Sequence, residues 1–61
     1  MSIYDNVKAA CKEKGVSISN LESDLKFARG SIYKWNNNTP GVDKVKAVAD
    51  YFKKPIEYFL E

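Results

Sequence analysis

The side chains best suited to binding chemistry are concentrated between Ala28 and Asn38. On a helix that turns by about 100° per residue, five of these residues would share one arc of roughly 140°: Arg29, Gly30, Tyr33, Lys34 and Asn37. The arc offers two cations, a phenol and an amide, and all of these groups can donate hydrogen bonds. Residues 25–42 contain no acidic side chain, although the chain carries eight. A polar surface with cations and without acids is typical of a site for a polyanion.

The opposite side of the same segment is apolar, because Ala28, Ile32 and Trp35 fall together at helical spacing. This pattern predicts a third helix over about residues 29–37, with a buried back and a polar front. We expect this helix to enter the major groove of double-stranded DNA, where arginine can pair with guanine and lysine can contact the same base edge. Gly30 has no side chain to read a base, so its expected value is a close approach of the helix backbone to the DNA.

Two further helices are predicted before this segment. Ser2 begins a Ser-x-x-Asp start signal for the first helix, and Gly15 supplies its stop. Ser17 is a good N-cap for a second helix over about residues 18–25. Because only two residues separate the second helix from the third, the two must meet at a steep angle. That arrangement is the helix-turn-helix.

Two more helices are predicted after it. Residues 36–39, three asparagines and a threonine, form a turn whose side chains can also hydrogen-bond phosphates. The apolar stripe of a fourth helix is formed by Val42, Val45, Val48, Ala49 and Phe52. Pro55 suits the first position of a short fifth helix, which is unusually apolar for a chain end because of Ile56, Phe59 and Leu60. No segment has the pattern of a strand, so the sequence predicts a compact all-α fold of five helices.

The composition excludes several classes of function. Sixty-one residues make one domain, residues 1–61, and the net charge of +2 is modest. The single cysteine, Cys11, cannot form an internal disulfide, and no histidine is present to complete a zinc site. We therefore expect no enzyme, metal or cofactor, and Cys11 is interpreted as a small buried hydrophobe. No run approaches the roughly 18 apolar residues of a membrane span, and the first residues are not a signal peptide, so we expect a soluble cytoplasmic protein.

Motifs spread over nearly the whole chain form a recognisable set. They are Gly15-Val16-Ser17, Leu21, Leu25, the run Arg-Gly-Ser-Ile-Tyr-Lys-Trp ending at Trp35, Pro40, Val45, Val48-Ala49 and Ile56-Glu57-Tyr58-Phe59-Leu60. This set resembles the lambda-repressor-like (Cro/repressor, or XRE) family. The resemblance implies a five-helix domain whose second and third helices form the helix-turn-helix. It also implies a transcriptional regulator of phage or mobile-element type that binds palindromic operators in double-stranded DNA as a homodimer.

The resemblance also implies which residues meet the DNA. The base-reading positions are Arg29, Gly30, Tyr33 and Lys34. Positions that approach the phosphate backbone are Ser17, Ile18, Ser31 and Asn37. Polar residues nearby complete the backbone candidates: Ser19, Lys26, Asn36, Asn38 and Thr39.

Six residues depart from the family pattern. Cys11 and Asn36 replace an arginine and a glutamate that often pair, so no charge is left unpaired there. Ile18 stands in place of a glutamine, which removes a side-chain phosphate contact. Glu22 replaces an alanine between the two helices, and we expect its carboxylate to turn outward. Lys26 replaces the glycine of the turn, and a left-handed backbone there costs lysine roughly 1 kcal/mol. Either Lys26 accepts this strain because its ammonium lies beside a phosphate, which we favour, or the turn follows another path. Ala28 replaces a Ser or Thr N-cap, which leaves backbone N–H groups free for a phosphate.

Other interpretations remain open at this stage. Arg29 and Lys34 are solvated surface cations in the simplest alternative, and Tyr33 packs on its neighbours or on DNA. The same fold also serves protein-interaction modules such as antitoxins and antirepressors, although an acidic or apolar third helix would be expected there. The sequence names neither the operator nor the regulated genes, and it does not distinguish a repressor from an activator. It also leaves open whether the chain is a whole regulator or the DNA-binding part of a larger one.

Overall fold

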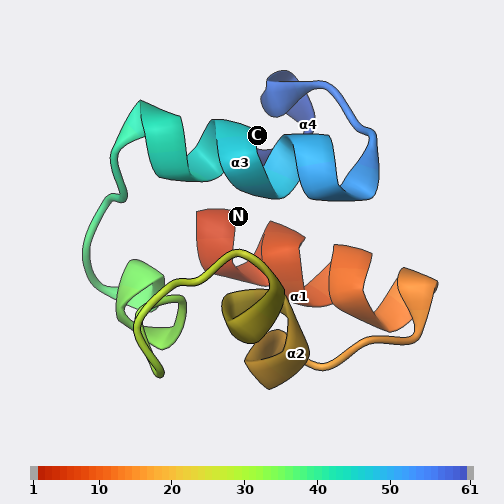
Figure 1. Ribbon diagram of the computed structural model, residues 1–61. Helices are drawn as coiled ribbons and strands as arrows, with labels where there is room; N and C mark the ends of the chain where they lie inside the picture. Colours follow the sequence, from red (N-terminus) through yellow and green to blue (C-terminus); the bar gives the residue numbers. More distant parts are fainter. Residues whose placement is uncertain (1, 61) are drawn as a thin grey trace.

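The computed structural model describes residues 2–60, which form four α-helices and one short 3-10 helix (Figure 1). In chain order these are α1 (Ile3–Lys14), α2 (Ile18–Asp24), η1 (Tyr33–Asn36), α3 (Val42–Phe52) and α4 (Ile56–Leu60). Residues 2–60 contain no strand, so the all-α prediction is confirmed. The expected third α-helix is absent, and η1 stands in part of its place. No helix in this part of the chain is both long enough and apolar enough to cross a bilayer.

The predicted caps of the first two helices are confirmed. The Ser2 hydroxyl accepts a hydrogen bond from the backbone N–H of Asp5 at 3.1 Å. Ser17 caps α2 in the same way, accepting from the N–H of Asn20 at 3.0 Å. These bonds satisfy backbone donors that have no partner within the helix, and this is why each helix begins where it does.

Three helices end in the same backbone motif. After α1, the left-handed residue is Gly15, and the N–H of Val16 donates back to the carbonyl of Cys11 at 3.0 Å. After α2 and α3, the same position is held by lysines, Lys26 with φ of 60° and Lys53 with φ of 56°. Each lysine accepts the strain of the left-handed region because the residue after it completes the paired hydrogen bonds of a Schellman ending. The left-handed backbone predicted for Lys26 is therefore confirmed.

The core is built around α1, which contacts every other helical element (Figure 1). The buried apolar residues of the core are Val7, Ala10, Cys11, Leu21, Ile32, Trp35, Val45, Val48, Ala49 and Phe59. The side-chain amide of Asn6 donates to the backbone carbonyl of Phe59 at 3.0 Å and joins α1 to α4 across the chain. Burial also raises the pKa of the Cys11 thiol, in agreement with its interpretation as a core residue.

One apolar expectation needs correction, and one that the sequence left open is resolved. Val42 does not belong to the buried stripe of α3: it is 69% exposed, because it forms the first turn of the helix beside the exposed Gly41 and Asp43, outside the core. At the chain end, Phe59 is fully buried and belongs to the core, whereas Leu60 is 53% exposed. The sequence could not separate the roles of these two neighbours.

Candidate nucleic-acid interface

The segment expected to form the recognition helix has a different backbone. Residues 25–32 form turns and extended connections between α2 and η1, and the 3-10 helix covers only Tyr33–Asn36. Gly30 has φ of 82°, which no α-helix contains. The prediction of a continuous helix over residues 29–37 is therefore wrong, and so is the prediction of a tight two-residue turn before it. The low helix propensity of Gly30 and Ser31 contributes to this result.

The main cause is Glu22, whose carboxylate faces inward. The prediction that it turns outward is wrong: Glu22 is 3% exposed. One carboxylate oxygen accepts from the N–H of Gly30 at 3.0 Å, and the other accepts from the N–H of Ile32 at 3.1 Å. A buried carboxylate costs free energy unless donors surround it, and these two donors supply that requirement. Glu22 thus ties α2 directly to the start of η1 and holds residues 28–32 in a turn.

This arrangement changes the roles of three predicted site residues. The N–H groups of Gly30 and Ile32 donate to the Glu22 carboxylate, so they are not free for a phosphate. The expectation of free N–H groups, which rested on the weak cap at Ala28, is wrong for these two residues. Gly30 is required for its positive φ, and a Cβ built there meets no atom within 4 Å. The expected role of Gly30 in a close helix approach to DNA is therefore wrong. The Ser31 hydroxyl is buried without a hydrogen-bond partner, so it does not face a phosphate in this conformation.

The charged candidates lie on the surface. Arg29, Lys34 and Lys26 are all exposed. Among residues 2–60, the ion pairs are Lys46–Asp50 at 3.8 Å and Lys54–Glu13 at 3.2 Å. The three candidate cations have no acidic partner within this part of the chain.

The two acids that precede the acid-free segment are both hydrogen-bonded to other groups of this chain. Glu22 holds the two backbone N–H groups described above, and Asp24 accepts a hydrogen bond of 2.6 Å from the Tyr51 hydroxyl of α3. That hydrogen bond, together with burial and the charge of Asp24, raises the pKa of Tyr51. Neither carboxylate forms an ion pair with Arg29 or Lys34.

Tyr33 combines the two alternatives that the sequence left open. It is 57% exposed, yet its ring packs on the ring of Tyr4 in α1, with 5.7 Å between centroids and 45° between planes. The Lys8 ammonium lies 5.6 Å from the centre of the Tyr4 ring. Sequence reasoning missed Tyr4 and Lys8, because their relation to Tyr33 exists only once α1 packs against η1.

Most residues expected to contact the DNA phosphate backbone are exposed, and some already form contacts within the protein. Exposed residues are Ser17, Ser19, Lys26, Asn36, Asn37, Asn38 and Thr39. The Ser17 hydroxyl already caps α2, so its oxygen accepts one internal hydrogen bond. Ile18 is half-buried and packs against the core, which explains why an apolar residue is acceptable at that position.

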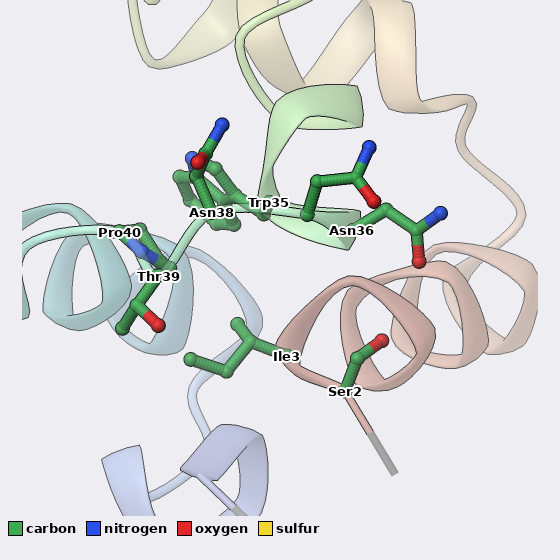
Figure 2. Close-up of a pocket in the computed structure, with 8 residues that line it drawn as sticks. Ser2, Ile3, Trp35, Asn36, Asn38, Thr39 and Pro40 are labelled. Carbon is green, nitrogen blue, oxygen red and sulfur yellow. The ribbon is translucent and has the colours of Figure 1, made fainter.

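The asparagine run borders an open pocket of about 280 Å³ beside the start of α1 (Figure 2). Its lining consists of Ser2, Ile3, Trp35, Asn36, Asn37, Asn38, Thr39 and Pro40. Figure 2 shows Ile3 on the α1 side of this space, with Thr39 and Pro40 on the loop side. The lining carries amides and hydroxyls but no ionisable side chain, so it can donate hydrogen bonds to an oxyanion without adding charge.

Comparison of the chain with known proteins identified no relative. No protein-family model, curated protein or solved structure matches this chain. Within residues 2–60, no group of three or more His, Cys, Asp or Glu side chains is arranged to hold a metal ion. The function is therefore inferred from the geometry and charge of the site itself.

Proposed function

We propose that this protein is a sequence-specific, double-stranded DNA-binding transcriptional regulator of the lambda-repressor-like type, acting as a phage or mobile-element repressor. Its DNA-facing unit consists of α2, the turns of residues 25–32 and η1. In this proposal the unit is a variant helix-turn-helix, in which a short 3-10 helix takes the position of a longer recognition helix. Double-stranded DNA is the partner, and no cofactor or metal is needed.

One observation carries the proposal: the cations of the acid-free segment 25–42 are exposed and form no ion pair among residues 2–60. The ion pairs among residues 2–60, Lys46–Asp50 and Lys54–Glu13, both lie outside this segment. Arg29, Lys34 and Lys26 instead remain available, while the carboxylates of Glu22 and Asp24 are hydrogen-bonded within the molecule. A surface of this kind attracts a polyanion by releasing the counterions that surround it.

In this proposal, some of these residues contact bases and others contact phosphates. Arg29 and Lys34 have the side chains that read guanine in the major groove. Lys26 and the amides of Asn36, Asn37 and Asn38 contact phosphates, which set the register of the protein on the duplex. Gly30 contributes by shaping the turn that presents Arg29.

A homodimer completes the proposal. One domain of this size makes few contacts, whereas two domains on a two-fold axis can read two half-sites about one DNA turn apart. The exposed Leu60, beside the partly exposed Tyr58, offers an apolar surface at the end of α4 that a second copy can cover.

Selection of bound duplexes from a random DNA pool tests this function. The expected result is enrichment of one short sequence, repeated with inverted symmetry at a spacing of about one helical turn. Recovery of a random mixture at every round would contradict sequence-specific binding. Protein retained on a single-copy half-site alone would contradict the dimer but not the DNA contact.

A further inference from the structure

The contact between α1 and η1 joins a lysine to the proposed DNA surface. Tyr4 lies on the first turn of α1 and Lys8 one turn later, so both project from the same side of the helix. The centre of the Tyr4 ring lies 5.7 Å from the centre of the Tyr33 ring and 5.6 Å from the Lys8 ammonium. Tyr4 thus contacts one side chain of η1 and one of α1. The three side chains, Tyr33, Tyr4 and Lys8, are called the row below.

The Lys8 ammonium is held but not neutralised. An aromatic ring attracts a cation through its quadrupole and leaves the three N–H donors free. Lys8 is exposed and has no carboxylate partner within residues 2–60. Lys54 differs, because its ammonium lies over Tyr58 and also pairs with Glu13 at 3.2 Å.

Resting on the proposed function, we propose that Lys8 binds a DNA backbone phosphate at the edge of the groove that Tyr33 enters, and that Tyr4 is the positioning residue for both. The scale of the row supports this assignment. Because Lys8 and Tyr33 both lie within 6 Å of the Tyr4 ring centre, their separation is no larger than the width of the major groove, about 12 Å. Tyr33 can therefore lie inside the groove while Lys8 contacts a phosphate at its edge, with the Tyr4 ring in contact with both. Helix α1 becomes part of the DNA-binding surface.

Salt-dependent binding of the full chain tests this contact. Binding of wild-type protein and of Lys8→Ala to the same DNA duplex is measured by fluorescence anisotropy at a series of salt concentrations. Loss of one phosphate contact reduces the slope of log affinity against log salt by about 0.9 and weakens all sequences by a similar factor. Lys12→Ala is the matched control, because Lys12 is an exposed lysine of the same helix without an aromatic partner in the described chain. It should leave the slope unchanged.

Two Tyr4 variants test the positioning role. Tyr4→Phe keeps the ring and should retain the wild-type slope, whereas Tyr4→Ala should reduce it as Lys8→Ala does. Combining Tyr4→Ala with Lys8→Ala should add no further loss of slope. Thermal melts of each variant verify that binding is measured on folded protein.

The outcomes separate this contact from the broader function. If Lys8→Ala keeps the wild-type slope while Arg29→Ala still weakens binding, the Lys8 contact is overturned and the DNA-binding proposal stands. If wild-type protein binds no duplex at any salt concentration, both proposals are overturned. Equal loss of slope in Lys8→Ala and Lys12→Ala would also overturn the assignment, because it would reflect net charge and not a specific contact.

Discussion

Replacement of Glu22 by glutamine tests whether the buried carboxylate organises the candidate site. The wild-type carboxylate accepts hydrogen bonds from Gly30 and Ile32 at 3.0 and 3.1 Å and is 3% exposed. Glutamine has nearly the same shape but only one oxygen. Its NH2 group would therefore face one of the two backbone N–H donors, and both groups would be left without an acceptor.

The expected size of the effect follows from these two bonds. A hydrogen bond to a charged group contributes about 1.5–3 kcal/mol, and a buried donor without a partner costs a comparable amount. Glutamine also removes the cost of burying a charge, which offsets part of the loss. We expect Glu22→Gln to lower the free energy of unfolding by about 2 kcal/mol. For a domain of this size, each kcal/mol corresponds to about 4–8 °C in Tm.

Thermal unfolding and amide hydrogen exchange measure the two parts of this prediction. The melt gives the loss of stability, and exchange at the Gly30 and Ile32 amides reports the local opening of the turn. Glu57→Gln is the control, because Glu57 is exposed and its replacement should change stability by no more than about 0.5 kcal/mol. A Glu22→Gln protein as stable as wild type, with unchanged exchange at both amides, would refute the role assigned to the carboxylate.

Three further predictions concern single residues of the surface. Lys26→Gly should raise Tm, because glycine adopts the left-handed region at no cost where lysine gives up about 1 kcal/mol, and it should weaken DNA binding at the same time. Lys53→Gly, at the equivalent position after α3, should raise Tm without affecting binding, and equal binding by the two variants would mean that Lys26 is not beside a phosphate. Arg29→Ala should cost about 1–3 kcal/mol on the selected site and relax preference at one base pair, whereas equal losses on selected and random DNA would mean that Arg29 only positions the protein. Leu60→Lys should reduce cooperative binding to a full palindrome while sparing the half-site, and an unchanged dimer by analytical ultracentrifugation would exclude Leu60 from the interface.

The features that the sequence predicted well depend on neighbouring residues. The caps at Ser2 and Ser17 and the stop at Gly15 each involve atoms only a few positions away. The left-handed backbone at Lys26 was predicted from the family resemblance, in which a glycine holds this position of the turn. Helical periodicity also identified α3 and most of the core, since the spacing of buried residues is fixed by the helix itself.

The features that the sequence did not predict depend on tertiary packing. The carboxylate of Glu22 finds its donors eight and ten residues later, in a segment whose own pattern favoured a helix. Because a charged residue is normally expected at the surface, nothing local indicated that this one would be buried. Tyr33 has the same difficulty, since its partner Tyr4 lies 29 residues earlier in the sequence. The cations of the candidate site could be listed from sequence, but the backbone that presents them could not.

Salt-dependent binding of the wild-type protein to duplex DNA tests the central claim most directly. Affinity for the selected palindrome is measured from low to physiological salt, with random duplex of the same length for comparison. We expect log affinity to fall linearly with log salt, by about 0.9 for each phosphate neutralised, with several phosphates per protomer. We also expect tighter binding to the selected sequence at every salt concentration. An affinity that does not change with salt, or that is the same for both duplexes, would contradict the central claim.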